Sequence, residues 1–243
     1  MTLKIFSILK RKQQNVLYMF FFDMLFFTVL IVIGRLINVF LPKNPADLSN
    51  ILARYGINTP LLLIILLAYY AGIVLLHSVC KLFILQNVGG LEGKIIKYDL
   101  KRFFGMNSII FIVLLGIFIG YSSLAFVLFK DAFFIVVTSI FLALFGLLSY
   151  VFISISQSLF MQGLSIKDIL KKAYNATCHQ GKRYVGYLGI IVVALILMWV
   201  SFGILETAPF RLLVTILAIS SLIFMYATIV WNRVGFWMLT KKL

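Results

Sequence analysis

Charged residues are scarce in this chain of 243 residues. Asp, Glu, Lys and Arg together make up 12% of it, whereas 63% of the residues are hydrophobic. A soluble globular domain carries about 25% charged residues. One water-facing globule cannot bury so much apolar surface, so the composition excludes an ordinary soluble domain and predicts that lipid forms part of the solvent.

Acidic residues are the rarer of the two charged kinds. The chain has 7 of them against 22 Lys and Arg, which gives a formal net charge of +15. Such a balance can indicate a nucleic-acid partner. Here, however, the basic residues gather between long apolar runs, as is typical of loops that orient a membrane protein. We therefore expect no nucleic-acid partner.

Cysteine and catalytic motifs are also lacking. The only two cysteines, Cys80 and Cys178, fall in a predicted span and a predicted loop, so they form no disulfide framework and no metal site. The chain contains no HExxH, GxSxG or Walker motif. We predict a non-catalytic protein with no catalytic residue, no metal and no cofactor.

Long apolar runs are what the sequence has in abundance. A helix needs about 20 apolar residues to cross the hydrocarbon core, and six segments are long enough. The sequence thus predicts an all-α fold, a polytopic transmembrane bundle that occupies residues 1–243 as one integral membrane domain. The six spans are Val16–Phe40, Pro60–Leu85, Ser108–Phe129, Phe133–Gln157, Val185–Leu205 and Phe210–Trp231.

The distribution of Lys and Arg predicts the orientation of these spans. With the ends of the spans included, 17 lie at the N-terminus, in the second-to-third and fourth-to-fifth connections and at the C-terminus, against 5 on the opposite side. Lys81 and Arg233 are counted among the 17. Because positive loops stay in the cytoplasm, we expect both termini on the cytoplasmic side of the plasma membrane. The first run is too long for a signal peptide and is taken as an uncleaved span.

Two of the basic connections have helical periodicity. In Ser165–Tyr174 the apolar residues recur on one face and the lysines take the other, and Ser165 with Asp168 form a capping box. Gly93–Phe104 has a similar pattern. Such helices lie in the membrane interface and favour anionic lipid headgroups. The residues expected to contact headgroups are Lys94, Lys97, Lys101, Lys167, Lys171 and Lys172.

The same alternation suggests an internal repeat. A basic amphipathic helix, a span, an outer connection and a returning span occur three times, starting near residues 2, 92 and 165. The similarity lies in the pattern and not in the residues themselves. True repetition and alternation imposed by topology remain alternative explanations.

Ionisable residues inside the predicted spans are the first candidates for a site, because charge in a membrane is costly. Asp23 and His77 lie deep in the first two spans, and Lys81 follows His77 at i+4 nearer the cytoplasmic edge. If the two helices pack side by side, Asp23 meets His77 or Lys81. The set is then either a proton or substrate relay, or a buried pair that fixes packing while Lys81 extends to the interface. Tyr70 would continue the stripe outward.

The fourth span carries a second polar stripe. Tyr150, Ser154 and Gln157 recur at helical spacing on one side of it. They either line a cavity or form the contact seam between helices, for which small and hydroxylated residues are commonly used.

The stretch Ser165–Ala194, in which a basic amphipathic helix leads through a short turn into a long apolar span, resembles a known pattern. It is similar to the uncharacterised six-span proteins that include the membrane domain of glycerophosphoryl diester phosphodiesterases. The resemblance implies the topology alone. It transfers no catalytic residue, and the chain lacks a phosphodiesterase domain.

These observations support two hypotheses about function. The first is a non-catalytic membrane organiser or accessory component whose partners are anionic lipid and other membrane proteins. The second is a permease or transporter subunit with a cytoplasmic partner and a path lined by Asp23, His77, Lys81 and the Tyr150–Gln157 stripe. No span contains an internal proline that would break it, which weakens the second.

Overall fold

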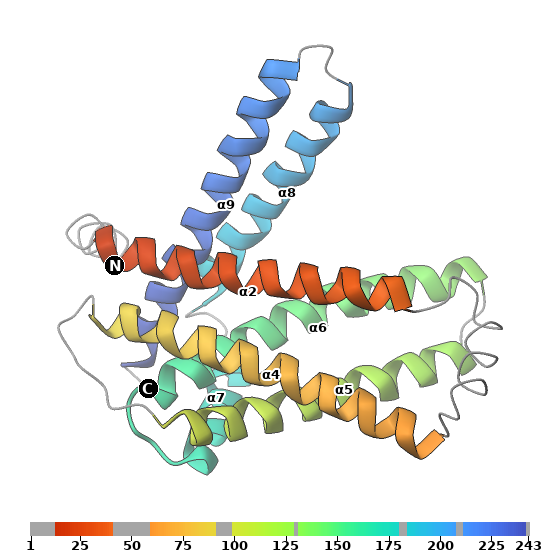
Figure 1. Cartoon of the computed structure of the whole chain (residues 1–243), viewed down its shortest axis with the longest axis vertical. Helices are drawn as coiled ribbons and strands as arrows, with labels where there is room; N and C mark the ends of the chain where they lie inside the picture. The colour runs from red at the N-terminus through yellow and green to blue at the C-terminus, as the bar shows by residue number, and fades with distance from the viewer. Residues whose placement is uncertain are drawn as a thin grey trace.

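A computed structural model describes residues 13–40, 59–90, 99–128, 131–179, 184–207 and 211–241. Apart from short turns, the described residues are helical, and they contain no strand. The all-α prediction is therefore confirmed for this part of the chain. Figure 1 shows the helices and their order.

Seven helices follow one another along the described residues, six of them long. The bounds are α2 (Gln13–Phe40), α4 (Thr59–Gly90), α5 (Leu100–Leu128), α6 (Asp131–Phe160), α7 (Ile166–His179), α8 (Val185–Thr207) and α9 (Arg211–Thr240). Each long helix covers one of the six predicted spans. Two of them extend further than the apolar runs suggested: α4 continues to Gly90 and α9 to Thr240.

Five of these helices are long and apolar enough to cross a membrane. The qualifying stretches are Gln13–Arg35, Leu67–Gly89, Leu100–Leu128, Phe134–Phe160 and Ile219–Thr240. These five apolar helices are compatible with a membrane protein. The predicted span that is not among these five is the fifth, Val185–Leu205, which corresponds to α8, and many side chains of this helix lie outside the described residues.

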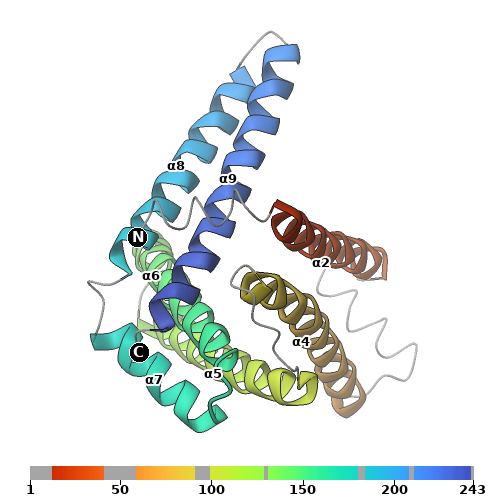
Figure 2. The same cartoon turned by 90° about the vertical axis from the view of Figure 1, so that its left-hand side faces the viewer.

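The long helices do not share one direction. Helices α2, α4, α5 and α6 pack in chain order, each beside the next, whereas α8 and α9 form a hairpin. Figures 1 and 2 both show this hairpin leaving the other four helices at a steep angle. The second half of α9 packs against α6, α2 and α4. The arrangement therefore differs from a simple bundle of parallel and antiparallel spans.

The packed core lies at one end of the molecule. We call it the basic end, because α2 and α5 begin there, α4 and α6 end there, and the two basic connections adjoin it. Asn15 donates from its amide to the Asn87 carbonyl oxygen at 3.0 Å, and the Arg102 guanidinium donates to the Leu164 carbonyl oxygen. Buried apolar side chains from α2, α4, α5, α6, α7 and α9 form one cluster there. It includes Met19, Val88, Phe103, Met106, Leu159, Ile169, Val234 and Phe236.

Local sequence determines how the chain turns at this end. The Asp99 carboxylate accepts a hydrogen bond from the Arg102 amide at 2.9 Å, which caps the start of α5. After α6, Gly163 adopts a φ of +79°, a conformation that side chains with a Cβ rarely take. The chain therefore reverses sharply between α6 and α7.

The amphipathic helix predicted after Ser165 is confirmed as α7. The Asp168 amide donates to the Ser165 hydroxyl at 3.2 Å, and the two side chains are hydrogen-bonded, which forms the expected capping box. The apolar face of α7 packs on the bundle: Ile169, Ala173 and Ala176 are buried, and α6 is its neighbour. This face therefore rests on protein at the basic end.

The other amphipathic segments fall mainly outside the described residues. Residues 1–12 and 91–98 are not described, and they include Lys94, Lys97 and the first two repeat starts. Lys101 is exposed, but it belongs to the first turn of the long α5 and not to a separate interfacial helix. The threefold repeat remains a prediction.

Candidate functional site

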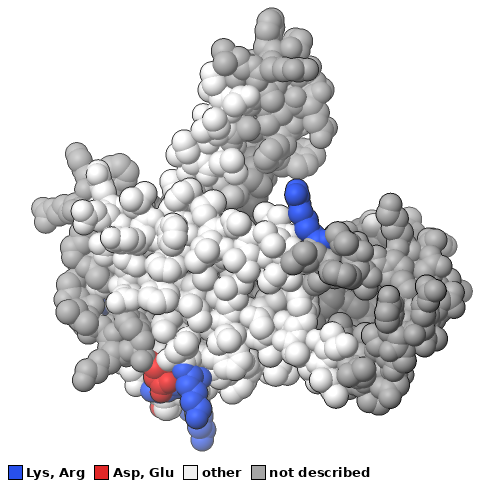
Figure 3. Space-filling view, viewed as in Figure 1, with Lys and Arg blue, Asp and Glu red and all other residues white. Residues whose placement is uncertain are grey.

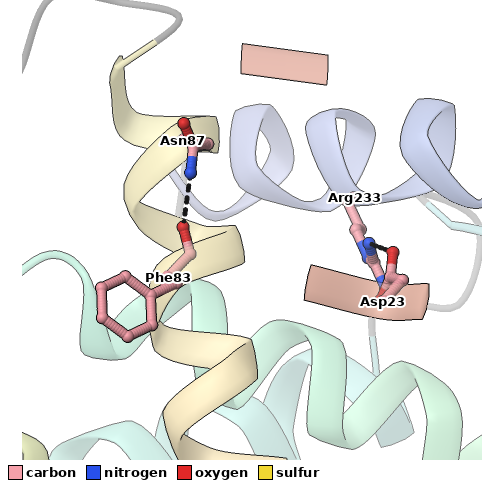
Figure 4. Close-up of polar contacts among 4 residues, drawn as sticks. All are labelled: Asp23, Phe83, Asn87 and Arg233. Atoms are coloured by element: carbon pink, nitrogen blue, oxygen red, sulfur yellow. Dashed lines mark hydrogen bonds and ion pairs between the residues drawn. The ribbon is translucent and has the colours of Figure 1, made fainter. Parts of the chain in front are cut away.

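The partner of Asp23 is Arg233. Both oxygens of the Asp23 carboxylate accept from the guanidinium, one of them at 2.7 Å. Figure 4 shows the two side chains facing each other from α2 and α9. Only 10% of the Asp23 side chain and 14% of the Arg233 side chain are exposed. The bidentate geometry is the strongest form of such a pair.

This pair adds to one sequence-based expectation and corrects another. Helices α2 and α4 do pack side by side, as the expected meeting of Asp23 with His77 or Lys81 requires, but the hydrogen-bond partner of Asp23 is Arg233. Arg233 was counted with the charges beyond the last span. Arg233 instead lies within the apolar stretch Ile219–Thr240. The run VGFWML that follows it was the available signal, because it extends the apolar segment past the arginine.

Lys81 also lies deeper than the sequence suggested. Its span continues to Gly89, eight residues further on, which is about 12 Å along a helix. It is partly buried and lies close enough to Asp23 and Arg233 to interact electrostatically with both. We therefore group Lys81 with Asp23 and Arg233.

His77 belongs to a chain of hydrogen bonds that joins three helices. The amide nitrogen of Gln157 lies 3.3 Å from His77 Nε2 and donates to Asn107 Oδ1, also at 3.3 Å. The Asn107 amide in turn donates to the Ser78 hydroxyl at 2.9 Å. Ser78, Asn107 and Gln157 are each at most 1% exposed. The chain therefore ties α4, α5 and α6 together inside the packed end.

Aromatic rings border this chain of polar side chains. The His77 ring makes edge contacts with Phe26 of α2 at 5.5 Å and with Phe111 of α5 at 5.2 Å between ring centroids. Phe20 meets Tyr226 of α9 at 4.9 Å. The polar groups are therefore set in apolar surroundings, where both hydrogen bonds and uncompensated charge have larger energetic effects than in water.

We call the charged residues and the hydrogen-bonded chain together the polar cluster. Its members are Asp23, His77, Ser78, Lys81, Asn107, Gln157 and Arg233. The sequence singled out four of them. Ser78 and Asn107 were missed, because single hydroxyl and amide residues near span ends are common and give no distinctive spacing.

The remaining predicted site residues are less closely connected. Tyr150 lies beside Ser154 and within electrostatic range of Arg233, so the stripe on α6 borders the polar cluster. The Tyr70 hydroxyl is buried without a hydrogen-bond partner, and none of the described contacts joins it to the cluster. The stripe thus borders the polar cluster, and the outward extension through Tyr70 stays a prediction.

Several polar atoms in this region have no hydrogen-bond partner. They include Gln157 Oε1, the hydroxyl of Tyr226 and both side-chain polar atoms of Asn232. Buried polar groups are normally satisfied, so each exception points to strain, to a functional role or to a missing partner.

Most of the exposed charges of the described residues lie near the basic end, while Arg35 is exposed near the opposite end of α2. Figure 3 shows a described surface that is almost free of charge, with basic and acidic side chains gathered at its lower edge and one separate basic side chain higher on the same face. Lys101, Lys167 and Lys171 are exposed, and Lys172 is partly buried. The expected headgroup contacts of these lysines remain a prediction.

Within the part of the chain that the structure describes, no group of three or more His, Cys, Asp or Glu side chains is placed to hold a metal ion. Comparison of the chain with protein-family models, with curated proteins and with solved structures found no match to any of them. The polar cluster must therefore be interpreted from its own geometry.

Proposed function

We propose that this chain is a non-catalytic multi-pass membrane protein that organises or assists other components of the plasma membrane. The observation that supports this proposal is that polar side chains within the packed end bind one another across different helices. Asp23 binds Arg233 across 210 positions of sequence, and Gln157 binds Asn107 across 50. Groups used in this way fix how helices pack, as interhelical polar contacts do in membranes.

The exposed face of α7 provides a surface for partners. Its apolar side is buried on α6, while Lys167, Lys171 and Tyr174 are exposed. On the predicted topology, with both termini cytoplasmic, this face lies at the inner interface. Anionic lipid headgroups and acidic segments of neighbouring proteins are the partners that such lysines attract.

Cys178 makes this surface directly testable. It is an exposed free thiol near the end of α7, whereas Cys80 is buried. A thiol-directed photo-crosslinker attached to Cys178 in native membranes should capture the neighbours of α7, which mass spectrometry then identifies. The matched control is Cys178→Ser, which keeps the buried thiol and should capture nothing.

Capture of integral membrane proteins would support the organiser. Recovery of a nucleotide-binding subunit would instead favour the second candidate, a permease subunit with α7 as its coupling surface. If crosslinking through Cys178 gives the same set of proteins as the Cys178→Ser control, the organiser proposal fails.

One observation favours the permease: Asp23, His77, Lys81 and Gln157 meet in one cluster, as residues that line a path would. A relay requires these side chains for activity and not only for folding. Asp23→Asn and His77→Ala should then abolish transport by the fraction of the protein that still folds. Lower thermal stability in both variants, with transport of the folded fraction unchanged, would exclude the relay.

A further inference from the structure

Helix α7 does not have its apolar face free to enter a membrane. Ile169 and Ala173 are 0% exposed and Ala176 is 2% exposed, because this face packs on α6. An amphipathic helix that binds a bilayer by insertion places its apolar face among the acyl chains. Contact between α7 and lipid therefore depends on the opposite face of the helix, and so on charge and hydrogen bonding.

The opposite face, which we call the lysine face, consists of Lys167, Lys171, Tyr174 and Cys178. These residues recur at i, i+4, i+7 and i+11, so they follow one stripe along the helix. All four are exposed, Tyr174 by 59%. Among the described residues, neither lysine has an ion pair. The lysine face thus presents two positive charges and one large aromatic ring to its surroundings.

The described acidic residues at this end lie off that stripe. The Asp168 carboxylate is hydrogen-bonded to Ser165 in the capping box of α7, and the Asp99 carboxylate caps the start of α5. Both are held at a helix N-terminus, where the partial positive charge of the helix end stabilises a carboxylate. The charge that the lysine face offers to a partner is therefore positive.

Helix α7 lies at the level where two apolar helices end. Its apolar face belongs to the same buried cluster as Phe103 and Phe160, whose ring centroids are 4.8 Å apart. Phe160 ends the apolar stretch Phe134–Phe160, and Phe103 lies in the first turn of Leu100–Leu128. Figures 1 and 2 both show α7 beside these two helix ends. Because a helix that crosses the hydrocarbon core ends among the headgroups, α7 lies at headgroup level.

We propose that the lysine face of α7 binds the headgroups of anionic lipids that surround the bundle. This inference rests on the proposed function and deepens it, because it names the partner of a surface that the organiser uses. Many exposed side chains of α5 and α6 are apolar, so lipid lies next to α7 in a membrane that holds the chain. Lysines attract anionic headgroups, and tyrosine favours the interface. An acidic protein is the less favoured partner, since lysine is depleted at protein–protein interfaces.

The test uses the exposed thiol of Cys178, which lies on the lysine face about 10 Å along the helix from Lys171. A donor fluorophore on Cys178 of the full chain is observed in nanodiscs of phosphatidylcholine and phosphatidylglycerol. A trace of one of the two lipids carries an acceptor on its acyl chain. At low salt we expect more energy transfer to labelled phosphatidylglycerol than to labelled phosphatidylcholine. The preference should be lost at about 1 M salt, where the Debye length is about 3 Å, because the contact depends on charge.

Substitutions separate charge from other causes of the preference. Lys167→Gln combined with Lys171→Gln should abolish it, whereas the same two changes to Arg should keep it, because the charge is retained. Arg35→Gln is the matched control and should also keep it, since Arg35 is an exposed basic residue near the opposite end of α2. Equal transfer to both lipids in the native chain overturns the proposal. A preference that survives the double change to Gln, or 1 M salt, also overturns it.

Failure of this proposal is distinguishable from failure of the organiser. If the photo-crosslinker on Cys178 captures membrane proteins while energy transfer to the two lipids is equal, the organiser stands and the headgroup proposal is wrong. Native mass spectrometry adds a measurement that needs no variant. Chain released from nanodiscs with equal amounts of the two lipids should retain more phosphatidylglycerol than phosphatidylcholine, and equal retention contradicts the proposal.

Discussion

Replacing Asp23 by Asn leaves the Arg233 guanidinium facing a neutral amide. The side chain keeps its size, so the change tests the charge and not the packing. Removing one partner of a buried ion pair costs about 3–5 kcal/mol, because the remaining charge stays desolvated without compensation. Both side chains here are mostly buried, at 10% and 14% exposure. We expect a loss near the lower end of that range, because the Asn oxygen still accepts a hydrogen bond.

The assay is thermal unfolding of the detergent-solubilised protein, followed by intrinsic fluorescence. For a chain of this size, about 1 kcal/mol shifts Tm by about 2–4 °C. A loss of about 3 kcal/mol therefore predicts a fall in Tm of about 6–12 °C for Asp23→Asn. The double variant with Arg233→Gln should recover most of this loss, because it leaves no unpaired partner.

Asp99→Asn is the matched control. It makes the same chemical change at a carboxylate that caps α5 in an exposed position. Asn caps helices about as well as Asp, so the expected change in stability is close to zero. The reasoning is refuted if Asp23→Asn behaves like this control, or if the losses of the two single variants simply add in the double variant.

Further predictions concern the packed end and the orientation of the chain. Ile169→Ala removes a fully buried side chain from the contact between α7 and the bundle, and it should lower the free energy of unfolding by about 2–5 kcal/mol, measured by denaturant titration. Asn107→Ala leaves groups on α4 and α6 without their partner, at a cost of about 1–3 kcal/mol in the same titration; an unchanged midpoint would show that the hydrogen-bonded chain is unimportant for packing. Because Cys178 is exposed and Cys80 buried, a membrane-impermeant maleimide should label only Cys178, and only in inside-out vesicles; labelling in intact cells would reverse the predicted topology.

Local sequence was sufficient to predict the helices themselves. A run of about 20 apolar residues is helical in lipid, because every backbone group must find its hydrogen-bond partner within the segment. The amphipathic helix after Ser165 was predictable for a related reason. Its capping box and its apolar face depend on residues at most eight positions apart, and both were found in α7.

The polar cluster was predictable only in part. The cost of charge in an apolar run indicated Asp23, His77 and Lys81 as site residues without any knowledge of the fold. Their hydrogen-bond partners did not follow. Consecutive helices do pack side by side, but the last helix also crosses the bundle and brings Arg233 to Asp23.

The sequence by itself predicted that lipid forms part of the solvent, the positions of the long helices and the residues whose charge needs an explanation. These properties depend on composition and on spacing within single segments. Only the tertiary structure decided which groups meet, because pairing between α2 and α9 depends on how several helices pack at the basic end. The same packing joins His77, Asn107 and Gln157 of three helices in one chain of hydrogen bonds, which no spacing within a single segment could indicate.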